Sequence, residues 1–357
     1  MSGHAHARPV RVVTSRTSIV GNGAILGRVS LQIDHVTKRF GATVALDGLA
    51  FDVPRGEVFG FLGANGAGKT TTMRICLGIV APDDGEIRWE GRPVGELPRR
   101  TWGYLPEERG LYPRMTVLDQ LVYYASLYGE SPERARREAL AWLLRFRIPE
   151  YAQRRAEELS KGNQQKVQFI AAILHGPEVL LMDEPFTGLD PINLVLLREA
   201  FMELRDRGRT LIFSTHQMEA AEAMCESVAI VDHGRLVAGG PLRDLKRASG
   251  RQWIRLAIDG PTPAPSWLGD LGGVEVVRRD ATGAELELLP GAKPATVLAD
   301  VLGRGVTISH FEVAEPSLEA LFIELVGHPA DEEGMPSLIQ GSASGPAQSS
   351  APAGGPA

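Results

Sequence analysis

The chain has 357 residues, 43% of them hydrophobic and 23% charged, a composition typical of a soluble globular protein of roughly two domains. The net charge of -6 argues against general affinity for nucleic acid, and two cysteines are too few for a disulfide framework and favour a reducing cytoplasm. No apolar run approaches the ~20 residues of a membrane-spanning helix, so action at a membrane would require a partner that supplies the span.

The two ends of the chain have the composition of disordered segments. Residues 1–28 contain no continuous apolar stretch like that of a secretory signal, and we expect a disordered extension. Because regular patterning starts at Val29, we hypothesise that translation begins there. Residues 328–357 are dominated by Gly, Ala, Ser and Pro, which predicts a disordered tail.

Residues 29–248 alternate short β-rich runs with helical patterns, which predicts an α/β domain. Runs 30–40 and 43–53 are expected to be paired strands, followed by a buried strand at 57–62. Three later apolar runs, 178–183, 210–215 and 227–232, are the expected parallel strands of the core. Between Met115 and Gly176 the pattern becomes helical, with capping residues at Thr116 and Ser131, which predicts a helical insert at about 104–176.

Residues 249–327 form a second pattern, separate from the first. Strand-like runs at 252–258, 274–279 and 285–289 precede a helix at 295–303, a strand at 306–313 and a last helix at 317–327. This order of elements predicts a small α+β domain. No residue pattern in this segment indicates a catalytic site.

The motif GANGAGKT occupies residues 63–70, directly after the predicted strand at 57–62. Its glycines allow backbone N–H groups to surround a phosphate chain, Lys69 can reach the β and γ phosphates, and the Thr70 hydroxyl can bind Mg²⁺. The alternative is a chance glycine-rich turn, which the strand before it and the helix after it disfavour. The expected nucleotide-binding residues are Gly63, Ala64, Asn65, Gly66, Ala67, Gly68, Lys69, Thr70 and Thr71.

A second motif, VLLMDEP, places two acids at the end of a buried strand. Asp183 can hold the Mg²⁺ shell, directly or through water, and Glu184 can orient and deprotonate the water that attacks the γ phosphate. Two acids after a strand are usually solvated end caps. Together with the phosphate loop, they favour ATP hydrolysis over nucleotide storage.

At this point the sequence resembles the ATP-binding subunits of ABC transporters over roughly residues 30–240. The resemblance rests on GANGAGKT, YLPEERGLY, LSKGN, LLMDEP, TGLDP and STH, in that order. It implies a P-loop NTPase core with an antiparallel β subdomain and a helical insert. The stretch YLPEERGLYPRMTV and the C-terminal EPSLEALFIELVG resemble the branch of sodium and drug exporters.

The resemblance assigns roles to further residues. In the family, ATP lies between two subunits, and the phosphate loop of one faces the signature of the other. The signature corresponds here to Leu159, Ser160, Lys161, Gly162 and Asn163, with Lys161 and Asn163 departing from the LSGGQ pattern. Lys161 would add a cation near the phosphate, and Asn163 is shorter than the usual glutamine. Asp190 would belong to the interface loop, His216 would contact the γ phosphate and position Glu184, and Phe40 would stack on adenine.

Several of these positions also have simpler interpretations. Phe40 could belong to the core, as aromatic residues in strands usually do. Asp190 before Pro191 is an ordinary helix start, and Ser160 is an ordinary helix cap. For Asp190 the helix start and the interface role can both be true. For Ser160 the two readings are compatible, because the exposed positive end of a helix that needs capping can also receive a γ phosphate from the opposite subunit.

Glu107 stands where the family commonly has glutamine, in a loop that touches metal and water. A carboxylate is a good oxygen ligand for Mg²⁺, although it adds negative charge beside the phosphates. We therefore include Glu107 with Thr70 and Asp183 as candidate metal ligands, and with Glu184 and His216 as a candidate catalytic residue. The alternative is that Glu107 turns outward and Glu108 or a water acts instead.

The leading hypothesis is an ATPase that drives export. It would use ATP and Mg²⁺, pair with a second ATP-binding subunit, identical or related, and move a separate membrane permease docked on the helical insert. It would then be cytoplasmic and peripheral on the inner face of the cell membrane, with no nucleic acid expected. The alternative from another class is a soluble ABC-type ATPase that acts on ribosomes, nucleic acid or cofactor assembly.

Overall fold

The computed structural model describes residues 29–108, 110–259, 266–279 and 283–327, and both predicted disordered ends lie outside them. The elements are, in chain order, β1 (Val29–Phe40), β2 (Thr43–Pro54), β3 (Val58–Leu62), α1 (Lys69–Cys76), β4 (Asp84–Trp89), β5 (Arg92–Pro93), β6 (Trp102–Leu105), α2 (Val117–Leu127), α3 (Pro132–Arg145), α4 (Lys161–Ile173), β7 (Val179–Asp183), α5 (Pro191–Asp206), β8 (Thr210–Thr215), α6 (Met218–Met224), β9 (Ser227–Asp232), β10 (Arg235–Pro241), α7 (Leu242–Ala248), β11 (Trp253–Asp259), β12 (Val274–Arg279), β13 (Gly283–Leu288), α8 (Pro294–Gly303), β14 (Thr307–Ala314) and α9 (Leu318–Val326).

A six-stranded sheet of order β10-β9-β3-β8-β7-β6 forms the centre of the molecule. Strands β9, β3, β8, β7 and β6 are parallel, and β10 pairs antiparallel with β9. Every residue of β3, β7 and β8 is buried, which explains why these strands read as continuous apolar runs. The predicted α/β core is confirmed, whereas the edge strands β6 and β10 were not predicted.

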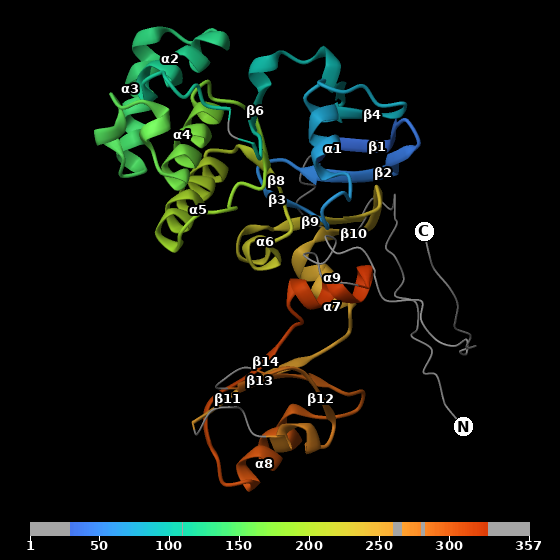
Figure 1. Ribbon diagram of the computed structural model, residues 1–357. Helices are drawn as coiled ribbons and strands as arrows, with labels where there is room; N and C mark the ends of the chain where they lie inside the picture. The colour runs from blue at the N-terminus through green and yellow to red at the C-terminus, as the bar shows by residue number, and fades with distance from the viewer. Residues whose placement is uncertain (1–28, 109, 260–265, 280–282, 328–357) are drawn as a thin grey trace, which may run out of the picture.

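The central sheet is covered on both faces (Figure 1). The antiparallel sheet β2-β1-β4-β5 and α1 lie on one face, where apolar side chains of both sheets form a shared core. Helices α4, α5 and α6 lie on the other face, α2 and α3 pack against α4 farther from the sheet, and together they enclose a second core (Figure 1). The phosphate-loop segment follows β3, and the carboxyl ends of the parallel strands lie at the same edge of this sheet.

Local sequence signals explain where the helices after β6 begin and end. The hydroxyl of Thr116 accepts from Asp119 N at 3.2 Å at the start of α2, and Ser131 caps α3 with Pro132 in its first turn. Gly129 follows α2 with φ of 87°, a conformation that favours glycine. Along the described chain, β6 and β7 are separated by helices and turns only.

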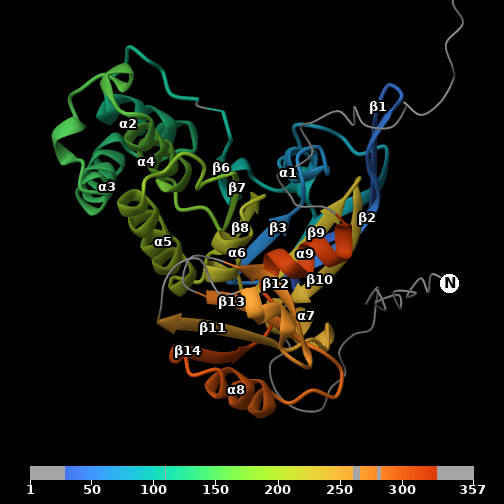
Figure 2. The ribbon, with the colours of Figure 1, turned by 60° about the horizontal axis from the view of Figure 1, so that its bottom comes forward.

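The last part of the chain folds into a third sheet, of order β12-β13-β11-β14 and antiparallel throughout. Helix α8 covers one face with a separate apolar core. Helix α9 returns from this sheet and contacts α6 and β10, as Figure 2 shows. Its Leu318, Leu321 and Phe322 belong to the core of the helical face of the central sheet. None of the described helices is long and apolar enough to cross a membrane.

Candidate active site

The loop at residues 63–68 connects β3 to α1, and close packing requires glycine at two of its positions. A Cβ on Gly63 would lie 2.4 Å from the carbonyl oxygen of Val231. Gly68 has φ of 104°, and a Cβ there would lie 2.6 Å from Leu46 Cδ2 and 2.7 Å from Ala45 O. The loop is thus pressed against β9 and β2, and glycine is needed for sterics as well as for phosphate access.

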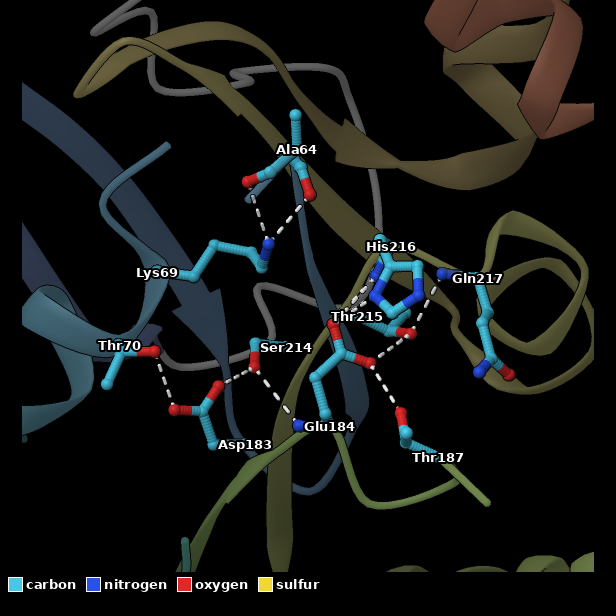
Figure 3. Close-up of polar contacts among 11 residues, drawn as sticks. Ala64, Lys69, Thr70, Asp183, Glu184, Thr187, Ser214, Thr215, His216 and Gln217 are labelled. Carbon is cyan, nitrogen blue, oxygen red and sulfur yellow. Dashed lines mark hydrogen bonds and ion pairs between the residues drawn. The ribbon is translucent and has the colours of Figure 1, made fainter. Parts of the chain in front are cut away.

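Lys69 opens helix α1 and is buried. Its Nζ donates to the carbonyl oxygens of Gly63 at 2.7 Å and Ala64 at 3.0 Å (Figure 3). The ammonium therefore lies over the loop at the start of α1, whose positive end also faces this space. Asn65 and Gly66 are exposed at the tip of the loop. A cation and the start of a helix converge where a phosphate group would bind.

Thr70 and Asp183 meet at the carboxyl end of β7. Thr70 Oγ1 donates to Asp183 Oδ2 at 2.7 Å, and Ser214 Oγ of β8 donates to the other carboxylate oxygen (Figure 3). Asp183 is 2% exposed, so these hydroxyls hold a nearly buried carboxylate in place. A hydroxyl and a carboxylate are the hard oxygen ligands that Mg²⁺ prefers. Within the described residues there is no group of three or more His, Cys, Asp or Glu that could hold a metal ion.

Glu184 follows Asp183 in a left-handed conformation, with φ of 48°. That conformation is strained for a non-glycine residue and turns the side chain away from that of Asp183. Oε1 accepts from His216 N at 3.0 Å and from His216 Nδ1 at 2.7 Å, while Oε2 accepts from Thr215 Oγ1 at 3.1 Å and from Thr187 Oγ1 at 3.3 Å. Figure 3 shows the carboxylate between these groups. A positioned carboxylate of this kind can orient a water and take its proton.

The loop after β6 carries the predicted residue Glu107, whose side chain is exposed. Gln168 of α4 holds the backbone of this loop, because its Nε2 donates to Pro106 O at 3.3 Å and to Glu108 O at 3.0 Å. Burial raises the pKa of the Tyr104 phenol, and the carboxylates of Asp183 and Glu107 raise it further. Among the described contacts, no hydrogen bond joins Glu107 to Thr70, Asp183 or Glu184, and its metal-binding role stays a prediction.

The LSKGN segment lies at the start of α4. Leu159 is buried in the helical-face core, and the Ser160 hydroxyl accepts from Asn163 N at 3.4 Å as a helix cap. Lys161 is exposed in the first turn. Further along the helix, Gln165 Nε2 donates to Pro185 O at 3.2 Å, which ties α4 to the segment after Glu184. No described contact joins residues 159–163 to the phosphate loop of the same chain.

Among the described contacts, neither Asp190 nor Phe40 is hydrogen-bonded to Glu184. Asp190 caps α5, as its Oδ1 accepts from Asn193 N at 2.9 Å. Phe40 ends β1 with 51% of its surface exposed, and Lys38 Nζ lies 5.4 Å from the ring centroid. The alternative interpretation of Phe40 as a core residue is therefore wrong. Its exposed ring is available for stacking.

Four polar residues around the site were not predicted: Thr187, Asn193, Ser214 and Thr215. The signal for Ser214 and Thr215 was present, since they end an otherwise apolar strand and β8 neighbours β7 in the sheet. Thr187 opens the TGLDP motif, but its contact with Glu184 was not predicted. For Asn193 no signal existed, because its role depends on the turn that brings its side chain back to Asp190.

Comparison with known families gives two matches. Residues 46–187 match the model described as ABC transporter. Residues 240–326 match the ATP-binding protein DrrA1-3-like, C-terminal domain.

Individual proteins match over most of their length. The chain is 46% identical over 297 residues to the uncharacterized ABC transporter ATP-binding protein YhaQ of Bacillus subtilis (strain 168), covering 83% of this chain and 98% of the relative. It is 34% identical to the Nod factor export ATP-binding protein I of Rhizobium sp. (strain N33), covering 85% and 98%. It is 32% identical to the linearmycin resistance ATP-binding protein LnrL of B. subtilis, covering 83% and 98%.

A solved structure described as the ATP binding subunit of an ABC transporter aligns with a TM-score of 0.58 and 34% identity. The alignment covers 62% of this chain and 93% of that chain.

Proposed function

The chain belongs to the family of ABC transporter ATP-binding proteins, and we propose that it is the subunit that hydrolyses ATP to drive an exporter. Proteins of this family bind ATP and are ATPases, and the resemblance indicated by the motifs is confirmed. Export is favoured by the names of two relatives, one a Nod factor export protein and the other a linearmycin resistance protein.

The observation that carries the proposal is the arrangement of Asp183 and Glu184 at the end of β7. Asp183 is joined to Thr70 of the phosphate-loop helix, and Glu184 is turned to His216 and two threonine hydroxyls. In this proposal Glu184 orients the attacking water and takes its proton, and His216 holds the Glu184 carboxylate in position. The phosphate loop and Lys69 bind the phosphates, and Phe40 stacks on the adenine.

Thr70 and Asp183 would hold Mg²⁺, with Glu107 as a further candidate ligand from the adjacent loop. The ion would neutralise charge on the β and γ phosphates during transfer. The hydroxyl–carboxylate contact of 2.7 Å between Thr70 and Asp183 places the two oxygen donors together and supports this assignment.

A second copy, or a related subunit, completes the site. The signature residues 159–163 make no described contact with the phosphate loop of their own chain, and Ser160 and Lys161 are exposed at a helix start. An exposed helix start with a lysine is suited to binding a γ phosphate presented by another subunit. Asp190 lies on the neighbouring loop and would contact the same partner.

The segment at about 104–158, which starts at the end of β6 and carries α2 and α3, docks a separate membrane permease, so the subunit works at the inner face of the cell membrane. The proposal is tested by isolating the tagged protein from membranes of its native host. We expect it to co-purify with a polytopic membrane protein whose presence raises its ATPase rate. Co-purification with ribosomes or nucleic acid, without a membrane partner, would instead support the soluble ABC-type ATPase.

A further inference from the structure

Asn193, in the first turn of α5, connects two segments far apart in the sequence. Its side chain is nearly buried, and its Nδ2 donates to Asp190 Oδ2 at 2.6 Å while its backbone N donates to Asp190 Oδ1 at 2.9 Å. The same Nδ2 atom lies 2.9 Å from the position that a Cβ on Gly162 would occupy. One amide group thus holds the Asp190 loop and packs against the first turn of α4.

The contact explains why glycine stands at position 162. Gly162 is inside a helix, and it is not among the glycines with positive φ, so its backbone conformation does not require glycine. Glycine is less favourable than alanine in a helix, by about 0.5 to 1 kcal/mol in its interior. A side chain here would meet Nδ2 of Asn193, and that amide could move aside only by giving up its hydrogen bond to Asp190 Oδ2.

We propose that Asn193 is a positioning residue that holds the signature turn and the Asp190 loop of one chain in a fixed relative register. The inference rests on the proposed two-subunit arrangement, in which both segments reach the partner's nucleotide site. When the register is lost, the two segments no longer meet the partner's site together. We therefore expect ATP-driven dimerisation to weaken, while the affinity of the single chain for ATP stays the same.

The first test concerns the contact itself and needs no second subunit. Thermal unfolding is measured for Gly162→Ala, Asn193→Ala and the double variant. We expect Gly162→Ala to lower the melting temperature in the parental chain and to have a smaller effect, or a stabilising one, when residue 193 is already alanine. Additive effects would show that the two residues are not coupled, and would overturn the inference.

The second test concerns register and uses Asn193→Asp, which keeps the shape, removes the amide donor and places a second carboxylate beside that of Asp190. The variant is made in a Glu184→Gln background, and sedimentation with ATP is run at a temperature where every variant is folded. Loss of one hydrogen bond to a charged group, together with repulsion between the two carboxylates, predicts dimerisation weaker by roughly tenfold or more. Calorimetry of ATP on the single chain should give the parental affinity.

Ser131→Ala is the matched control, because Ser131 caps α3 by accepting from Arg134 N at 3.3 Å, away from the site. It should lower thermal stability and leave dimerisation unchanged. If Asn193→Asp behaves like this control, its role is only structural and the positioning inference is wrong. If the Glu184→Gln parent does not dimerise with ATP, the two-subunit proposal fails and the positioning role fails with it, whatever the coupling of Gly162 and Asn193 shows.

Discussion

His216 donates twice to one oxygen of Glu184, through its ring Nδ1 at 2.7 Å and its backbone N at 3.0 Å. Since a carboxylate oxygen only accepts, the ring must carry its proton on Nδ1. The imidazole plane and the carboxylate are thereby fixed relative to each other across two neighbouring strands. The position of the Glu184 carboxylate, the proposed base, therefore depends on the backbone and the ring of His216.

Changing Glu184→Gln should stall hydrolysis and preserve ATP binding. The amide replaces one acceptor oxygen by a donor and cannot take a proton from water, so we expect the ATPase rate to fall by about 100-fold or more. Phosphate release and ATP calorimetry measure the two effects, and gel filtration should show an ATP-bound dimer. Glu178→Gln, at the opposite end of β7 and exposed, should behave as the parent. Parental hydrolysis by Glu184→Gln would rule out the general-base role.

Thr215→Val should reduce turnover because it removes a donor to Glu184 Oε2 while keeping the side-chain shape. The hydroxyl also accepts from Gln217 N at 2.9 Å, so the turn after His216 would loosen as well. We expect roughly a tenfold lower kcat with little change in ATP affinity. Thr210→Val is the control, since its hydroxyl accepts from Gly56 N at 2.9 Å at the other end of β8. Equal losses of kcat in both variants would mean that the effect is general destabilisation.

The central strands could be predicted because a strand buried on both faces must be apolar throughout, as in β3, β7 and β8. The edge strands could not. Strand β6 has only four residues, and β10 contains two glycines and is exposed or half-buried along its length. Their pairing depends on neighbours that the local pattern does not contain.

The same distinction holds for the site. Glycines, a lysine and two acids at strand ends are visible in the sequence, because phosphate binding needs those residue types at fixed spacing. The left-handed turn at Glu184 and the packing of Asn193 against Gly162 are tertiary features. The first lies at the end of β7 and the second between the first turns of α4 and α5, so spacing alone could not indicate them.

Lys161→Ala should have opposite effects on stability and on ATP use. A cation in the first turn of α4 is unfavourable to the helix dipole, so its removal should stabilise the chain by about 0.3 to 1 kcal/mol. If Lys161 binds the partner's γ phosphate, the same change should raise the ATP concentration for half-maximal hydrolysis severalfold. Lys293→Ala, an exposed lysine at the start of α8, is the control for the dipole effect alone. If Lys161→Ala leaves the ATP concentration for half-maximal hydrolysis unchanged, Lys161 does not bind the partner's γ phosphate.

Phe322→Ala should loosen the attachment of the C-terminal sheet to the first domain. The ring is 1% exposed in the helical-face core, and α9 is further tied to α6 because Leu318 N donates to Glu222 Oε2 at 2.8 Å. Truncating a buried phenylalanine should cost about 3 to 5 kcal/mol of unfolding free energy. Denaturant unfolding measures this loss. Ile323→Ala, with 38% of its surface exposed, should cost much less. Similar losses in the two variants would contradict a docked α9.

His175 should make the protein less stable as the pH falls. Its Nε2 lies 2.9 Å from Trp102 O and must donate, its Nδ1 is buried without a partner, and its ring stacks on Tyr128 at 3.8 Å. Burial lowers the pKa of this imidazole below its ordinary value of 6.5. The unfolded chain therefore takes up a proton below about pH 6.5 while the folded chain does not, and stability is lost as pH falls through that range. His175→Gln retains a donor for Trp102 O but does not titrate. Melting temperatures between about pH 7.5 and 5.5 should fall less steeply for the variant, and parallel curves would show that His175 does not contribute.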